Sequence, residues 1–213
     1  MKGHAMPADA QFDIRNTAAL EALFDAPAAA SLAKELDHVD DFYRQWIAAS
    51  PFVALATVGA GGLDCSPRGD SAGFVDVIDA TTLILPERRG NNRIDSLRNL
   101  IADPRIALLF LIPGLGETLR INGRARISAD PALLERYAVG GKPPKVVLVI
   151  TVEAVFFQCS RAVVRAGLWD AARHIDRHSL PTPGQILQRA SESAIDGAAY
   201  DAALPGRIRD TLY

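Results

Sequence analysis

Short apolar runs alternate with glycine-containing turns from residue 52 to residue 157, and this pattern is typical of β-strands. The clearest strand is residues 118–127, where apolar side chains occupy every second position and mostly arginines stand between them. We therefore expect that strand to bury one face and expose the other. Residues 106–112 are continuously apolar, so we expect burial on both faces. Residues 146–157 are rich in β-branched side chains and complete the strands.

Turns and helical spacing define the other predicted elements. Glycine-rich and Asp-Ala turns between apolar runs predict hairpins, whereas apolar residues three and four positions apart predict helices. The strands expected from these turns are residues 52–58, 63–68, 74–78 and 82–85, and the expected helices are residues 91–101, 132–137 and 160–169, the last of which is a helix or a turn. Together these segments give about six or seven strands with a few inserted helices.

Both ends of the chain have helical rather than β character. Thr17 is expected to cap a short helix, because its hydroxyl can accept a hydrogen bond from an N–H group at a helix start. Pro51 is expected to end a second helix, since the residue before a proline avoids the helical region. The apolar face of that helix is expected to contain Val39, Phe42, Tyr43, Trp46 and Ile47. From Pro181 onward, prolines, alanines and glycines punctuate the chain and predict weak helices.

The order of these elements predicts a fold class. Regular short strands separated by turns favour an antiparallel barrel or sandwich over alternating β-α-β units. We predict a mainly β fold with flanking helices that forms one domain overall. Within it, residues 1–50 form an N-terminal helical arm, residues 51–170 the barrel or sandwich, and residues 171–213 a C-terminal arm.

Composition narrows the class of protein. The 213 residues carry a net charge of −2, the arginines are interleaved with acidic residues, and 7% of the residues are aromatic. These features argue against a nucleic-acid groove. No apolar run approaches the roughly 20 residues of a membrane-spanning helix, and the first residues lack the apolar core of a signal peptide. Two cysteines cannot form a disulfide scaffold, so a reducing cytoplasm is the expected location.

Arginines gather at two turns that follow predicted strands. Arg68 lies in the sequence Ser-Pro-Arg-Gly-Asp, and Arg88, Arg89 and Arg93 stand near the start of the helix expected over residues 91–101. A cation at a helix start is unfavourable for the helix itself, and a bound anion would offset that cost. Helix N–H groups and guanidinium groups together suit a phosphate. We therefore favour an anion site over the alternative of solvated surface charges.

Other candidate motifs are weaker. His174 and His178 are spaced to share one helix face, but no third metal ligand is marked, so a solvated face is favoured and no metal site is predicted. The Gly-Gly-Lys sequence at residues 140–142 lacks the spacing of a phosphate-binding loop, so an ordinary loop is expected. Cys65 and Cys159 have no paired histidine and no CxxC spacing, and they are expected to be buried as small apolar side chains.

Several segments of the chain resemble one protein family. They are Leu83-Ile84-Leu85-Pro86, Asn92-Arg93-x-x-Ser96-Leu97-x-Asn99-Leu100, Asp103-Pro104-Arg105-Ile106-Ala107-Leu108-Leu109-Phe110, Leu119-Arg120-Ile121-Asn122-Gly123-Arg124-Ala125 and Cys159-Ser160-Arg161-Ala162-x-x-Arg165-Ala166-Gly167-Leu168-Trp169. In this order they resemble the pyridoxamine 5′-phosphate oxidase-like flavoproteins, over roughly residues 41–170. The resemblance implies a split β-barrel of antiparallel, Greek-key type that forms a homodimer with FMN at the interface.

The resemblance also implies how the cofactor is held. A strand arginine would reach the FMN phosphate and ribityl chain, and an asparagine–arginine pair near the helix start would clamp the phosphate. The backbone of a second strand would follow the isoalloxazine edge, a third strand would come from the partner subunit, and a tryptophan would lie near the ring. The strand arginine is Arg68, with Gly69 beside it, and the phosphate pair is Asn92 and Arg93, to which Asn91 adds an amide donor. The second strand supplies Ile84, Leu85 and Pro86, the partner's strand supplies Glu117, Thr118 and Leu119, and the tryptophan is Trp169.

The substrate is not implied by the same resemblance. Pyridoxamine phosphate oxidase itself carries an Arg-x-x-Leu-Leu-Lys strand, whereas residues 68–73 read Arg-Gly-Asp-Ser-Ala-Gly. The expected function is therefore an FMN-dependent oxidoreductase acting on an unidentified small molecule, in which the flavin carries the redox chemistry and no catalytic residue is assigned. Three alternatives stay open: a deazaflavin-dependent reductase, a non-catalytic flavin-binding or redox-sensing protein, and a β-barrel that binds a polymer without flavin.

Overall fold

The computed structural model describes residues 12–213. Contacts within the chain divide it into two units, Met1–Lys34 and Glu35–Tyr213. In the described part of the first unit, helices α1 (Thr17–Glu21) and α2 (Ala29–Ala33) contain no buried residue. The predicted cap is wrong, because the side chain of Asn16 accepts a hydrogen bond from the N–H of Ala19 at 2.8 Å and Thr17 is already helical.

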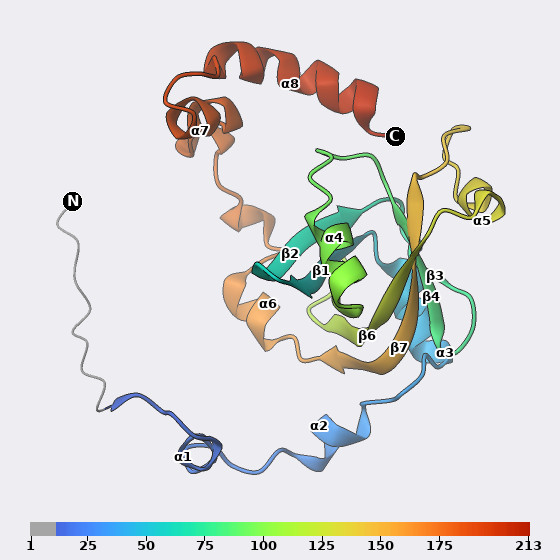
Figure 1. Cartoon of the computed structure of the whole chain (residues 1–213). Helices are drawn as coiled ribbons and strands as arrows, with labels where there is room; N and C mark the ends of the chain where they lie inside the picture. The colour runs from blue at the N-terminus through green and yellow to red at the C-terminus, as the bar shows by residue number, and fades with distance from the viewer. Residues whose placement is uncertain (1–11) are drawn as a thin grey trace. The chain divides into compact units, whose positions relative to one another are not determined.

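The second unit contains a seven-stranded antiparallel sheet (Figure 1). Its strands are β1 (Phe52–Gly59), β2 (Gly62–Gly69), β3 (Asp76–Val77), β4 (Thr82–Glu87), β5 (Arg105–Leu111), β6 (Thr118–Ser128) and β7 (Val146–Gln158). They are ordered β2-β1-β5-β6-β7-β4-β3, so β2 and β3 are the two edges and no backbone ladder joins them. The predicted mainly β, antiparallel split-barrel class is thereby confirmed.

The core lies on one face of this sheet, where alternate strand residues pack against α3 (Asp41–Ala49) and α4 (Asp95–Ala102). In β6, Leu119 and Ile121 are buried while the arginines between apolar positions are exposed, as the alternation predicts. The prediction for β5 is only half right, since Leu108 is buried but Leu109 is partly exposed. The outer side of β5 is not fully covered by the part of the chain that the structure describes.

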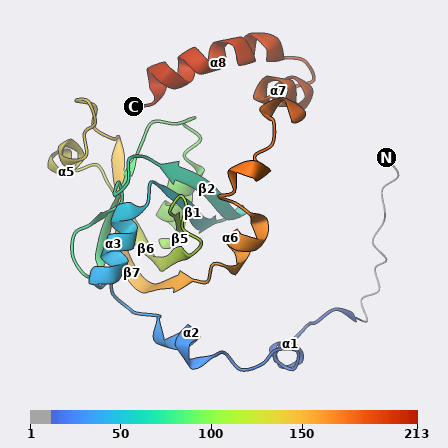
Figure 2. The same ribbon diagram turned by 180° about the vertical axis from the view of Figure 1, so that it is seen from behind.

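Helix α3 lies across the sheet near β6 and β7 (Figure 2). Asp40 caps it by accepting a hydrogen bond from the N–H of Tyr43, and Tyr43 and Ile47 are buried. Phe42, predicted for the same face, is 74% exposed, because it lies at the margin of that face. The remaining α-helices are α5 (Pro131–Arg136), α6 (Arg161–Ala166), α7 (Pro183–Ala190) and α8 (Gly197–Thr211), and two short 3₁₀ helices cover Ala171–Arg173 and Arg177–Ser179.

Strand β7 contains a β-bulge opposite Gly123 of β6. Asn122 pairs with Ala154 and Gly123 with Val152, so Glu153 is an extra residue. This extra residue resets the alternation of β7, and Val152 and Val155 are both buried although they are three positions apart. Among the described residues, no helix is long and apolar enough to cross a membrane.

Candidate functional site

The candidate site lies at the split between the two edges of the sheet. Residues 85–87 of β4 pair with β7, but β3 pairs only with Leu83 and Ile84, so one backbone edge of residues 85–87 has no strand partner in the described chain. Pro86 suits such a position because it has no N–H to leave unpaired. Strand β2 likewise pairs on one side only, with β1. Backbone from both edges is therefore available to a ligand.

Strand β2 presents a row of polar side chains to the inner face of the sheet. Asp64, Ser66 and Arg68 stand opposite Thr57, Leu55 and Val53 of β1, all three of which are buried. Residues directly opposite in an antiparallel pair share one face. We call Asp64, Ser66 and Arg68 the β2 polar row. Its ends are four residues, or about 13 Å, apart along the strand.

Two ion pairs bridge the split at the Arg68 end of this row. Arg68 Nε lies 3.0 Å from Glu87 Oε2, and Arg88 Nε lies 2.6 Å from Asp70 Oδ2. All four side chains are largely buried, and that of Asp70 is 4% exposed. Strands β2 and β4, which share no ladder, are thus joined by side chains. It also follows that a phosphate at Arg68 would have to displace Glu87.

Asp70 is the centre of a larger polar cluster. Besides Arg88, it accepts hydrogen bonds from the Tyr213 hydroxyl at 2.7 Å and from the N–H of Ser71 at 2.7 Å. Burial acts to raise the pKa of the Asp70 carboxyl, but the hydrogen bonds from Tyr213, Ser71 and Arg88 outweigh it, so the pKa lies below its usual value. Arg88 also donates to the carbonyl oxygen of Tyr137 at 2.6 Å, which ties α5 to the same cluster.

Asp70→Asn is expected to make the free energy of unfolding less sensitive to acid. Because the pKa of Asp70 is depressed in the folded chain, its ionised form adds stability above the unfolded value of about 3.9, and this stability is lost as the pH falls through the folded value. In urea unfolding, wild type and variant should differ most near neutral pH and converge below about pH 4. The same difference at every pH would contradict this assignment.

The entry to α4 differs from the sequence prediction. The helix begins at Asp95 and not at residue 91, because Asn92 and Ile94 adopt left-handed backbone conformations with φ of 60° and 53°. The Asn91 side chain accepts a hydrogen bond from the N–H of Arg93 at 3.0 Å, which favours a turn over a helix. Ile94 at the N-cap position makes no side-chain cap. The N–H groups that open α4 are therefore not satisfied by a cap side chain.

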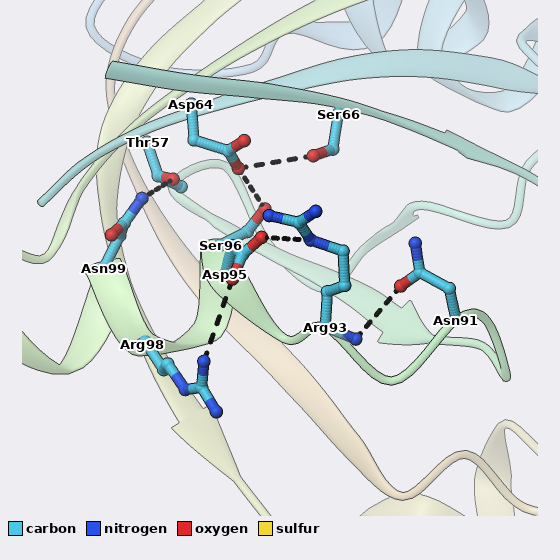
Figure 3. Close-up of polar contacts among 9 residues, drawn as sticks. All are labelled: Thr57, Asp64, Ser66, Asn91, Arg93, Asp95, Ser96, Arg98 and Asn99. Atoms are coloured by element: carbon cyan, nitrogen blue, oxygen red, sulfur yellow. Dashed lines mark hydrogen bonds and ion pairs between the residues drawn. The ribbon is translucent and has the colours of Figure 1, made fainter. Parts of the chain in front are cut away.

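Side chains of α4 meet the Asp64 end of the β2 polar row (Figure 3). Ser96 Oγ and Ser66 Oγ both donate to Asp64 Oδ2, at 2.7 and 3.3 Å. Arg93 Nε donates to Asp95 Oδ2 at 2.7 Å, and this hydrogen bond raises the pKa of the guanidinium. The side chain of Arg93 is 75% exposed, so it is free to rotate toward a ligand at modest cost.

A cavity of about 330 Å³ opens at this place. Its lining residues are Gly61, Gly62, Leu63, Asp64, Arg93, Asp95, Arg98 and Asn99. Two arginines and an uncapped helix start suit a phosphate, whereas two carboxylates oppose it. Both arginines already lie within 4 Å of Asp95. The donor set therefore fits the phosphate end of FMN, provided that the arginines exchange that carboxylate for the phosphate.

The structure brings some of the predicted cofactor residues together and separates others. Arg93 lines the cavity, and Asn91 and Asn92 form the exposed turn before it, but Arg68 and Gly69 lie at the far end of the β2 polar row. The side chains of residues 84–86 are buried, so only their backbone can meet a ring. The predicted partner-side and ring-side residues do not line the cavity; they are Glu117, Thr118, Leu119 and Trp169.

Two of these predicted residues have other contacts in the chain. Leu119 is 1% exposed and its side chain belongs to the core, so it offers a ligand only its backbone. The Trp169 ring N–H donates to the carbonyl oxygen of Leu115 at 2.7 Å, and this residue is 37% exposed. Glu117 and Thr118 are partly exposed. All four stay predicted cofactor residues.

Sequence reasoning missed the acidic members of the site. Asp64 could have been predicted, because it lies two residues before Ser66 and four before Arg68 and must therefore face the same side of the strand. Glu87 could not be found in this way, since its pairing with Arg68 joins strands that are not neighbours in the sheet.

The structure also tests the predictions for the histidine pair, the Gly-Gly-Lys loop and the two cysteines. His174 follows one short 3₁₀ helix and His178 lies within another, so the two do not share a helix, and no group of three metal-ligating side chains occurs in the described chain. Residues 139–142 form a tight loop, as predicted. Cys65 and Cys159 are exposed, so their predicted burial is wrong. Cys65 alternates to the outer face of β2, away from the polar row.

Comparisons with known proteins gave matches to solved structures and to one family model. HupZ from Group A Streptococcus is 24% identical with a TM-score of 0.46, over 57% of this chain and 95% of that one. A Clostridium acetobutylicum protein of the pyridoxinephosphate oxidase family, related to general stress protein 26, is 17% identical with a TM-score of 0.44, over 57% of this chain and 91% of that one. No match was found among curated proteins. The family model described as pyridoxamine 5′-phosphate oxidase matches residues 39–159, more than half of the chain, and this protein belongs to that family.

Proposed function

We propose that this protein binds FMN at the split and is an FMN-dependent oxidoreductase acting on a small molecule. The observation that carries the proposal is the entry to α4, where an uncapped helix start and Arg93 face the β2 polar row across a cavity. Such a start holds an anion through backbone N–H groups, and a guanidinium adds charge-assisted hydrogen bonds. Membership of the family adds support for a flavin ligand.

The chain's own residues would bind and orient the cofactor. Arg93 and the N–H groups that open α4 would hold the phosphate, with Asn92 beside them, and Ser66 and Ser96 would turn their hydroxyls from Asp64 toward it. Arg68 would bind further along the β2 polar row after leaving Glu87. When bound, the flavin supplies the redox chemistry. The unpaired backbone edge of residues 85–87 offers hydrogen-bonding groups for the ring.

The proposal includes a homodimer. A second cavity of about 330 Å³ lies on the outer face of the sheet, over β1, β2 and β5 and beside the bulge of β6 and β7. Its lining includes the apolar Ala56, Val58, Leu63 and Ala107 and the polar Arg105, Asn122 and Glu153. Leu63 is 88% exposed, which is unfavourable for a large apolar side chain next to other apolar ones. A second copy of the chain would bury this face. The mass in solution, measured by sedimentation equilibrium, tests the assembly. The cytoplasmic location stays a prediction from composition.

The test of the proposal is flavin uptake followed by turnover. We expect the purified protein, after incubation with FMN and removal of the excess, to keep the visible absorbance of the flavin at close to one per subunit. Reduction of that bound flavin by a nicotinamide donor, and its reoxidation, would support an oxidoreductase. FMN binding without turnover would favour the flavin-binding or redox-sensing alternative. Uptake of a deazaflavin in place of FMN would favour the deazaflavin-dependent reductase, and uptake of neither would overturn the proposal.

A further inference from the structure

We propose that Tyr213 is a latch that fastens residues 181–213 to the rim of the split and thereby slows exchange of the ligand bound there. The part of this inference that concerns flavin rests on the proposed function. The latch itself rests on contacts within the chain.

Tyr213 is held at three points that come from three different segments. Its hydroxyl donates to Asp70 Oδ1 at 2.7 Å, and its ring lies 5.9 Å from the guanidinium carbon of Arg88. Its backbone carbonyl oxygen accepts a hydrogen bond from Lys142 Nζ at 3.2 Å. The hydrogen bond to Asp70 raises the pKa of the Tyr213 hydroxyl, so the donor keeps its proton at neutral pH. One residue thus contacts the segments after β2 and after β4 through its side chain and the segment after α5 through its backbone.

These contacts fall on the residues that bridge the split. Asp70 and Arg88 form one of the two bridging ion pairs, and each lies within two residues of a member of the other pair, Arg68 with Glu87. Tyr213 supplies a hydrogen bond to one partner and covers the guanidinium of the other. Its departure would leave Asp70 with one donor fewer in a largely buried position. The bridge beside the candidate flavin site would therefore loosen.

The segment that carries Tyr213 is a pair of closely packed helices. Thr182 and Gln185 form a capping box at the start of α7, and Asp201 of α8 accepts hydrogen bonds from Thr182 and from the N–H of Gly184. The two helices approach so closely that a Cβ on Gly184 would lie 2.0 Å from the carbonyl oxygen of Gly197. Because α7 and α8 hold each other, releasing one end of the pair would move the whole segment.

Tyr213 is the point at which this pair is fastened. In the described chain, the hydrogen bonds between residues 181–213 and the strand-bearing part of the unit all involve Tyr213. A single attachment of this kind makes the position of the segment depend on one residue, whose side chain supplies the hydrogen bond to Asp70 and the ring over Arg88.

The experiment compares Tyr213→Ala and Tyr213→Phe with a matched control, Tyr200→Phe. Tyr200 lies on α8 with its ring 4.2 Å from the guanidinium carbon of Arg207, a contact inside the same helix. Trypsin cleavage at the arginines of α8 measures how often the segment opens. We expect Tyr213→Ala to accelerate cleavage by about tenfold or more, Tyr213→Phe to lie between it and wild type, and Tyr200→Phe to match wild type.

A second measurement tests the link to the ligand. The protein is loaded with FMN and mixed with excess apoflavodoxin, which captures the flavin as it is released. The release rate should rise in Tyr213→Ala and stay unchanged in Tyr200→Phe. Cleavage of Tyr213→Ala at the wild-type rate would overturn the latch. Faster cleavage with an unchanged rate of FMN release would overturn its control of the site. If the wild-type chain takes up no FMN, the proposed function fails, and the cleavage rates still decide whether Tyr213 is a latch.

Discussion

Arg68→Ala/Arg93→Ala is expected to bind FMN at least about 100-fold more weakly than wild type. Each arginine would give the phosphate or ribityl chain charge-assisted hydrogen bonds, which are worth about 1.5–3 kcal/mol apiece. Two such losses correspond to a factor of about 10²–10⁴ in Kd. The lower value is expected, because each guanidinium must first leave a carboxylate, Glu87 or Asp95. Fluorescence titration with FMN measures the change.

The control for this prediction is Arg209→Ala. Arg209 lies on α8, its side chain is 79% exposed, and its carboxylate neighbour Asp210 is 3.8 Å away. Removing the same charge at this place should leave the FMN affinity unchanged. Equal affinity in the double variant and in wild type would refute the site assignment, while the fold would stand. Loss of affinity in Arg209→Ala as well would mean that the net charge of the chain, and not a site, attracts the flavin.

The single variants separate the two ends of the β2 polar row. Arg93 lines the cavity at α4 together with Asp64, whereas Arg68 is about 13 Å from Asp64 along β2. A larger effect of Arg93→Ala would place the phosphate at the start of α4. A larger effect of Arg68→Ala would place it at the ion pair with Glu87.

Most of the sheet could be predicted because its physical cause is local. The alternation in β6 follows from one buried and one exposed face, and the hairpin of β1 and β2 follows from a glycine-rich turn. The start of α4 was predicted wrongly, because a side chain there competes with the helix for a backbone hydrogen bond. The Asn91 side chain accepts a hydrogen bond from the N–H of Arg93, and the backbone of Ile94 is left-handed. The helix therefore starts four residues later than apolar spacing indicates.

The electrostatic partners in the site could not be predicted in the same way. Arginine turns alone indicated an anion site, but Glu87 and Asp95 already neutralise Arg68 and Arg93. The first of these pairs depends on how the two edges of the sheet approach each other, which no sequence spacing encodes. An anion at the candidate site would therefore have to replace these carboxylates as the partner of each arginine, and their charge would oppose its binding.

Gly123→Ala is expected to destabilise the fold by an amount at the upper end of the about 1–3 kcal/mol usual for overpacking. A Cβ at residue 123 would lie 2.1 Å from the carbonyl oxygen of Thr151 and 3.1 Å from its carbonyl carbon. These are backbone atoms of β7, which cannot rotate away as a side chain can. Relief would require moving β7 at the bulge, where the extra residue Glu153 sets which valines face the core.

Gly61→Ala is the matched control for this substitution. Gly61 lies in the turn between β1 and β2, and a Cβ there would meet no atom within 4 Å. Urea unfolding should give Gly61→Ala the free energy of unfolding of wild type, or slightly more because alanine restricts the unfolded chain. A Gly123→Ala protein as stable as Gly61→Ala would show that β6 and β7 separate at the bulge at little cost. A large difference would establish that residue 123 must lack a side chain for the two longest strands to pair in the register that buries both Val152 and Val155.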